Sequence, residues 1–183
     1  MKKTAVIDID NTLWQFCDAF YLELKKLNEN FPEIDQWSTF DFWEPYCSKE
    51  EFMAGINAIH FDQDNDRYRP YPEAQDFLQS LRSRGFHVII ASHRLAGTRQ
   101  ATERWLSRHL LPYDELHLSF DKTVLFDRAG VVVDDAPATL ERAVACGAKG
   151  AGLLFPWNRA YAGNGFGLFP DLKAVLRYIL EPT

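Results

Sequence analysis

Two acidic residues, Asp8 and Asp10, follow a short run of β-branched and apolar residues near the N-terminus. Side chains of a strand alternate between its faces, so residues two apart share a face if the strand continues. The strand ends here, because Asn11 and Thr12 favour a turn. Two carboxylates crowded at a strand end repel each other unless a cation lies between them. The spacing therefore indicates a divalent metal, and so chemistry rather than packing.

Other polar side chains stand at the ends of later apolar runs. Ser92 ends the run 87–92, Asp134 and Asp135 follow the valines that precede them, and Lys122 comes shortly before that run. Ligands of a doubly wound sheet collect at the carboxyl ends of its strands. Carboxylates, a hydroxyl and a lysine are suited to phosphoryl transfer, and oxygen ligands suit Mg²⁺.

The elements that must position these residues alternate between strand and helix patterns. The sequence predicts strands at 4–10, 87–92, 115–120, 130–135 and 152–155, and helices at 14–28, 49–59, 72–85, 98–109, 137–146 and 170–180. Strands this apolar, separated by helices, indicate a parallel sheet covered on both faces.

One segment interrupts the alternation. Residues 29–71 are rich in aromatic side chains, so we expect a small helical cap insertion at 15–71. The core is then expected to comprise residues 1–14 and 72–183. The glycine-rich residues 163–167 are expected to form a flexible loop.

Composition limits the function classes. The chain has 183 residues and a net charge of −6, which argues against binding long nucleic acid but permits a small anionic substrate at a metal. No apolar run reaches the length of a membrane span, so no membrane partner is expected. Residues 1–3 lead directly into a predicted strand, so we expect no signal peptide. The odd number of widely spaced cysteines fits a cytoplasmic protein.

The ordered set of motifs resembles the haloacid dehalogenase superfamily of phosphatases over nearly the whole chain. The matching residues are Asp8, Asp10 and Thr12 of a DxDxT motif, Ser92 at a strand end, Lys122, and the pair Asp134 and Asp135. The resemblance implies a Rossmann-like three-layer α/β sandwich with the first strand central. It also implies a cap inserted between the first two motifs.

Within that superfamily the chain is similar to the 5′(3′)-deoxyribonucleotidases. The likeness lies in residues 121–124, residues 154–159 and the aromatic insert. Asn11 stands where that family usually has Gly. The resemblance implies magnesium-dependent hydrolysis of a small phosphomonoester, with (deoxy)nucleoside monophosphates as the expected substrates.

The resemblance also implies roles for the motif residues. Asp8 would attack phosphorus and form an aspartyl-phosphate. Asp10 would protonate the leaving alkoxide and then deprotonate the attacking water, for which we expect a raised pKa. Mg²⁺ would be held by Asp8, by the main-chain carbonyl of Asp10 and by Asp135, with Asp134 as a further ligand or a support. Ser92 and Lys122 would hold the phosphoryl oxygens, and Lys122 would also pair with Asp8.

Further residues are candidates for substrate contacts. His93 and Arg94 follow a predicted strand end, where they could contact the phosphate or the base. Phe16 matches an aromatic of the deoxyribonucleotidase pattern, and Trp43 belongs to the aromatic insert; both could stack on a base. The remaining histidines, 60, 87, 109 and 117, lie apart in the sequence and are expected to be structural or exposed.

Three other functions stay open. Ser92-x-Arg94 resembles polynucleotide 3′-phosphatases. The acidic net charge argues against this function, and a local basic patch argues for it: Arg94, Arg99, Arg104 and Arg108. A sugar-phosphate phosphatase would use the same motifs. A regulatory module that binds metal or phosphate without turnover is disfavoured by the intact pair Asp8 and Asp10.

Overall fold

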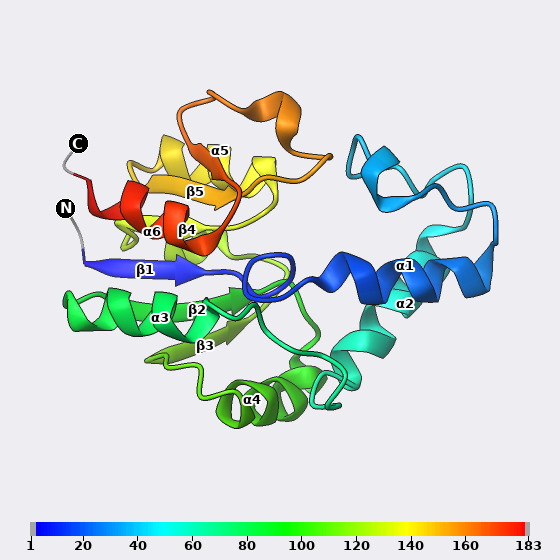
Figure 1. Cartoon of the computed structure of the whole chain (residues 1–183), viewed down its shortest axis with the longest axis horizontal. Coiled ribbons are helices and arrows are strands. Elements are labelled where there is room, and N and C mark those ends of the chain that lie inside the picture. The colour runs from blue at the N-terminus through cyan, green and yellow to red at the C-terminus, as the bar shows by residue number, and fades with distance from the viewer. Residues whose placement is uncertain (1–2, 182–183) are drawn as a thin grey trace.

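Six strands form one parallel sheet in the computed structural model of the chain, which describes residues 3–181 (Figure 1). The strands are β1 (Thr4–Ile7), β2 (His87–Ser92), β3 (Glu115–Leu118), β4 (Val131–Val133), β5 (Lys149–Leu153) and β6 (Gly167–Phe169). Their order is β3-β2-β1-β4-β5-β6, so the chain reverses direction across the sheet at β1. The predicted Rossmann-like α/β class and the central first strand are confirmed. Residues 1–2 and 182–183 of the expected core lie outside the described range.

Helices lie between the strands, close to where the sequence predicts them. They are α1 (Phe16–Leu27), α2 (Lys49–Phe61), α3 (Ala74–Ser83), α4 (Arg99–Arg108), α5 (Pro137–Ala145) and α6 (Leu172–Leu180). Short 3-10 turns occur at Ile34–Gln36, Ala96–Thr98, Thr123–Leu125 and Arg159–Tyr161. Within residues 3–181, no helix combines the length and the apolar character needed to cross a bilayer.

The two faces of the sheet bury separate clusters of side chains. On β1, Ala5 and Ile7 point into the cluster that contains the apolar faces of α3 and α6. Val6 points to the other face, where Leu140 and Ala143 of α5 cover it. The alternation along β1 thus explains why helices are needed on both sides.

The segment between β1 and α3 contains α1 and α2, which lie to one side of the sheet in Figure 1. Phe20 of α1 packs edge-on against Phe52 of α2, with ring centroids 5.0 Å apart. The sequence marks the start of α2 well, since Ser48 and Glu51 form a reciprocal capping box there. We propose that residues 15–71 act as a cap and that residues 1–14 and 72–183 form the core.

The last two strands differ from the sequence-based expectation. β5 begins at Lys149 rather than near residue 152, because its two glycines conceal the strand pattern. A Cβ atom at Gly152 would collide with the main-chain oxygen of Asp134, so the close approach of β4 and β5 requires glycine there. The expected loop at 163–167 ends in β6, which pairs with β5 at the sheet edge.

Candidate active site

The first acid of the site follows β1 directly. Asp8 donates its main-chain N–H to the carbonyl of Val133 at 2.9 Å, so the sheet register continues one residue past β1. The main-chain N–H groups of Thr12 and Leu13 then both bond to the carbonyl of Ile9, which turns the chain away from the sheet. The carboxylate of Asp8 is thereby left at the carboxyl end of the sheet beside β4.

Asn11 holds this turn to the rest of the site. Its φ of 53° lies in the left-handed region, which asparagine tolerates better than most residues. This conformation explains how Asn11 can stand where the resembling family usually has glycine. The side-chain amide donates to Oδ2 of Asp135 at 3.1 Å, and its oxygen accepts the N–H of Cys17 at 2.9 Å. Asn11 therefore ties the start of α1 to the second acidic pair.

Lys122 joins the two acidic motifs. Its ammonium group forms an ion pair with Oδ1 of Asp8 and another, at 2.8 Å, with Oδ2 of Asp134. All three residues are buried. The predicted pairing of Lys122 with Asp8 is present in the structure, and Asp134 adds a second partner.

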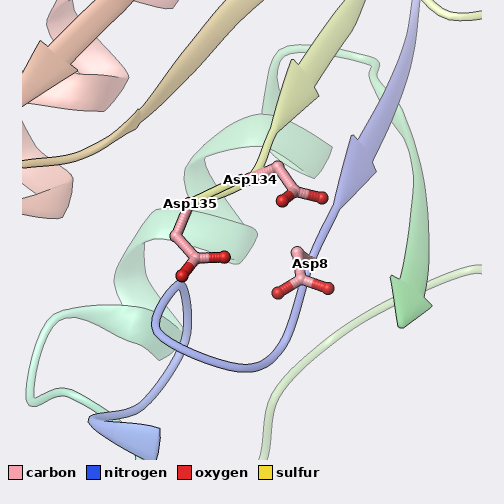
Figure 2. Close-up of side chains that lie close together, drawn as sticks. All are labelled: Asp8, Asp134 and Asp135. Atoms are coloured by element: carbon pink, nitrogen blue, oxygen red, sulfur yellow. The ribbon is translucent and has the colours of Figure 1, made fainter. Parts of the chain in front are cut away.

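Three buried carboxylates converge at this end of the sheet (Figure 2). Asp8, Asp134 and Asp135 each place one oxygen within 4.8 Å of the others. Both oxygens of Asp134 already accept hydrogen bonds, from Lys122 and from the N–H of Ala136 at 2.9 Å. Oδ2 of Asp8 and Oδ1 of Asp135 have no hydrogen-bond donor among residues 3–181, so they are the oxygens available to a cation.

The electrostatics of this cluster favour a cation. Burial raises the pKa of Asp8 to about 7, against the opposing charge of Lys122. Burial and the charge of Asp134 also raise the pKa of Asp135 well above its ordinary value. One ammonium group therefore does not compensate three buried carboxylates. The all-oxygen donor set fits Mg²⁺, a hard divalent cation that would supply the missing positive charge.

Asp10 lies in a separate network of donors. Its Oδ1 accepts hydrogen bonds from Nη2 of Arg94 at 2.6 Å and from Nε1 of Trp14 at 2.9 Å. Its Oδ2 lies 2.9 Å from Nε2 of His60 and 3.4 Å from Oγ of Ser92. The carboxylate is therefore surrounded by donors from α2, from the end of β2 and from the turn before α1.

This environment corrects the expectation that Asp10 has a raised pKa. Burial raises that pKa, but the guanidinium of Arg94 and the contact with His60 outweigh the burial and lower it. Asp10 is consequently ionised in this structure. The reason for the error is that the sequence places Arg94 84 residues, and His60 50 residues, from Asp10.

The three residues at the end of β2, Ser92, His93 and Arg94, differ in burial and in contacts. Ser92 is buried at the strand end and accepts a hydrogen bond from Nε of Arg94 at 3.0 Å. Arg94 is also buried, with Nη1 donating to Thr102 of α4 at 3.1 Å. His93 is exposed between them. Arg94 thus contacts Asp10 rather than the apolar pocket next to the site.

That pocket lies beside the acidic cluster and has a volume of about 340 Å³. Aromatic and apolar side chains line most of it, and they come largely from the proposed cap: Phe16, Phe20, Trp37, Phe40, Phe42, Trp43, Phe52, Met53 and Ile56, with Trp157 from the core. The rings of Trp43 and Phe52 stack at 4.6 Å. Asn11 and Asp135 form its polar end, so the pocket and the acidic cluster share residues.

Solved structures of low identity share this fold. One is a predicted phosphatase from Clostridium acetobutylicum, with a TM-score of 0.68 and 15% identity over all of both chains. A second is a predicted phosphoglycolate phosphatase from Haemophilus somnus 129pt, with a TM-score of 0.62 and 14% identity over 96% of each chain. A third is the HAD-hydrolase YfnB from Bacillus subtilis bound to magnesium, with a TM-score of 0.61 and 14% identity. The match covers 98% of this chain and 99% of that one. The fold is therefore that of the haloacid dehalogenase hydrolases.

A match to a family model over most of the sequence identifies the family of this chain. The model of the family described as 5′ nucleotidase, deoxy (Pyrimidine), cytosolic type C protein matches residues 4–163. The chain belongs to this family and is a phosphoric monoester hydrolase of the haloacid dehalogenase type. A comparison with curated proteins gives no match.

Several residues of the site were not predicted. His60 was expected to be structural or exposed, yet it contacts Asp10. Trp14 was assigned only to the predicted helix, and Trp157 donates to Asp135 at 3.2 Å. The contacts of His60 and Trp157 join segments far apart in the sequence, whereas Trp14 donates to Asp10 only four residues away. The tryptophans near motif residues, at positions 14 and 157, were the one available signal.

Proposed function

We propose that this chain hydrolyses (deoxy)nucleoside monophosphates in a magnesium-dependent reaction through an aspartyl-phosphate on Asp8. The observation that supports the substrate class is the aromatic pocket that shares Asn11 and Asp135 with the acidic cluster. A nucleobase requires flat apolar walls, and a phosphate requires a cation and hydrogen-bond donors. The aromatic walls and the candidate ligands of a cation adjoin at Asp135, which supports a substrate that combines a base and a phosphate. The family's cytosolic description also supports a cytoplasmic location.

The proposed metal ligands are Asp8 and Asp135, with the main-chain carbonyl of Asp10. Asp134 supports them, because its two oxygens are engaged by Lys122 and by Ala136. Bound there, Mg²⁺ would neutralise the buried carboxylates and the negative charge of the transferring phosphoryl group.

The proposed nucleophile is the carboxylate of Asp8, which attacks phosphorus in line while the alkoxide leaves. Lys122 contacts Asp8 directly and favours its ionised form, and it can also receive a phosphoryl oxygen. Ser92 lies at the end of the neighbouring strand and supplies a hydroxyl donor. Preorganised donors of this kind provide most of the rate increase in phosphoryl transfer.

Asp10 is the proposed general acid–base. Its ionised form in this structure is the one needed to deprotonate the water that hydrolyses the aspartyl-phosphate. Protonation of the leaving alkoxide requires Asp10 to hold a proton when substrate is bound. Arg94 and His60 hold this carboxylate. We therefore propose that Arg94 acts on the substrate indirectly, by positioning Asp10.

Phe16 and Trp43 are the proposed base-stacking residues, since both line the pocket. His93 is exposed next to buried Ser92, and we propose that it contacts a phosphate or sugar that enters from solvent. The polynucleotide 3′-phosphatase alternative loses support, because each arginine of the expected basic patch is paired with an acid. The pairs are Arg94–Asp10, Arg99–Glu103, Arg104–Asp64 and Arg108–Asp66.

Phosphate release from a panel of substrates tests this proposal. The panel contains 5′- and 3′-nucleoside monophosphates, sugar phosphates and 3′-phosphorylated oligonucleotides, each with Mg²⁺ and with a chelator. We expect magnesium-dependent release that is fastest with a nucleoside monophosphate. Trp43→Ala should raise KM for nucleotides by about 5-fold or more, since base–aromatic stacking contributes about 1–3 kcal/mol.

The matched control is Leu22→Ala, because Leu22 is an exposed residue of α1 outside the pocket. It should leave KM unchanged. A higher kcat/KM for sugar phosphates or oligonucleotides than for all mononucleotides would contradict the proposed substrate class.

A further inference from the structure

His60 occupies an unusual position for a histidine of a helix end. It lies in the last turn of α2 and is 2% exposed. Nε2 contacts Oδ2 of Asp10 at 2.9 Å, while Nδ1 has no hydrogen-bond partner among the described residues. Its ring also lies beside that of Phe16, with centroids 5.5 Å apart. Within the described part of the chain, the only hydrogen-bond partner of the His60 ring is therefore the proposed general acid–base.

A purely structural role does not account for this arrangement. Buried polar groups are normally hydrogen-bonded, and an unsatisfied ring nitrogen carries a desolvation cost. The other oxygen of Asp10 accepts from Arg94 and Trp14, and Nε2 of His60 lies 2.9 Å from Oδ2, so we assign the ring proton to Nε2 as the donor to this carboxylate. Within residues 3–181, Asp10 is thus the one hydrogen-bond partner that orients the ring, which indicates that the contact serves Asp10.

The carboxylate of Asp10 is held from two directions. Arg94, from the core, bonds Oδ1, and His60, from α2, reaches Oδ2. The segment that follows α2 is fastened to α4 by two ion pairs, Arg104 with Asp64 at 2.6 Å and Arg108 with Asp66 at 2.8 Å. The position of His60 is thus fixed relative to the core.

We propose that His60 is a positioning residue through which the cap orients Asp10 toward the leaving oxygen. This inference rests on the proposed function, in which Asp10 protonates the leaving alkoxide. Without His60, Arg94 and Trp14 still hold Oδ1, and the remaining donor at Oδ2 is the more distant hydroxyl of Ser92, at 3.4 Å. The second oxygen then loses its nearest donor and can rotate away from the reacting atoms. Proton transfer depends on such geometry, because the acid must lie within hydrogen-bond reach of its target.

Substrates with different leaving groups distinguish a positioning role of His60 from a purely structural role. An aryl phosphate expels a weakly basic phenolate that needs little protonation, whereas an alkyl phosphate expels an alkoxide that depends on a general acid. We would measure kcat/KM, which reports the steps through departure of the leaving group, for p-nitrophenyl phosphate and for a nucleoside 5′-monophosphate. The variants are His60→Phe, which removes the donor, and His60→Gln, which restores an N–H at a similar distance.

We expect His60→Phe to lower kcat/KM by about 10-fold or more for the alkyl phosphate and by less than about 3-fold for the aryl phosphate. His60→Gln should recover most of the alkyl activity. The aryl rate shows that each variant is folded, and Ile59→Val, a change at the buried neighbour in α2, should affect both substrates equally.

Equal losses on both substrates in His60→Phe, or no rescue by His60→Gln, would overturn the positioning role while wild-type activity stands. A wild-type protein that hydrolyses neither phosphate would instead overturn the proposed function on which this role depends.

Discussion

At the scale of single residues, the site is governed by an excess of buried negative charge. Asp8, Asp134 and Asp135 share one ammonium group, that of Lys122. Asp10 differs, since Arg94 and His60 keep it ionised. The four aspartates of these motifs thus divide into a cluster that we propose binds a metal and one carboxylate that we propose transfers protons.

The raised pKa of Asp8 predicts a pH dependence of stability. Burial moves this pKa from 3.8 to about 7, so between these values the folded chain keeps a proton that the unfolded chain has lost. The stabilising contribution is present at the lower pH and is lost as the pH rises to about 7. We expect the free energy of unfolding of metal-free wild type, relative to Asp8→Asn, to fall by on the order of 4 kcal/mol across this range.

Denaturant unfolding at several pH values, in the presence of a chelator, measures this difference. Groups that do not interact with Asp8 contribute equally to both proteins, so their contributions cancel in the comparison. Added Mg²⁺ should reduce the fall in wild type. A difference that stays constant or grows with pH would show that Asp8 is not destabilised by its burial.

At the scale of elements, the parallel strands determine where the acids meet. Asp8 and Asp134 follow the neighbouring strands β1 and β4, whose register pairs Ile7 with Val133. The sequence predicted this meeting because apolar runs that end in acids mark the carboxyl edge of a sheet. It placed the start of β5 three residues too late and did not predict β6, because glycines replace apolar residues that identify a strand. Gly152 shows why: β5 passes too close to Asp134 for a side chain.

Gly152→Ala tests this close approach. Its Cβ would meet the main-chain oxygen of Asp134, so β4 and β5 must separate where the second acidic pair begins. We expect a loss of about 1–3 kcal/mol of stability together with lower phosphatase activity. Thermal unfolding and phosphate release measure the two effects.

The control is Gly55→Ala in α2, where the new Cβ would contact only the ring of Phe20 at 3.3 Å. Alanine favours a helix over glycine by about 1 kcal/mol, so stability should not fall by a comparable amount. A Gly152→Ala protein as stable and active as the wild type would show that β4 and β5 can separate without affecting the site.

At the scale of the whole molecule, the candidate active site combines acids at the carboxyl ends of β1 and β4 with a pocket lined largely by the aromatic insert. The ordered motifs predicted the superfamily, the central strand and the acidic cluster, because each motif is local in the sequence. The contacts of His60 and Trp157 were not predicted, because they depend on how distant segments pack. The insert was recognised as a break in the pattern, but its pocket becomes visible only when Phe16 and Trp43 are seen to line one cavity.

The central claim is that Asp8 receives the phosphoryl group. The most direct measurement is mass spectrometry of peptides after rapid acid quench of the protein with a nucleoside monophosphate and Mg²⁺. The Asp10→Asn variant should prolong the intermediate, since it lacks the base that activates water. We predict a phosphorylated peptide that contains Asp8, present in wild type or Asp10→Asn and absent in Asp8→Asn. Phosphorylation at another residue, or undiminished turnover by Asp8→Asn, would contradict the account.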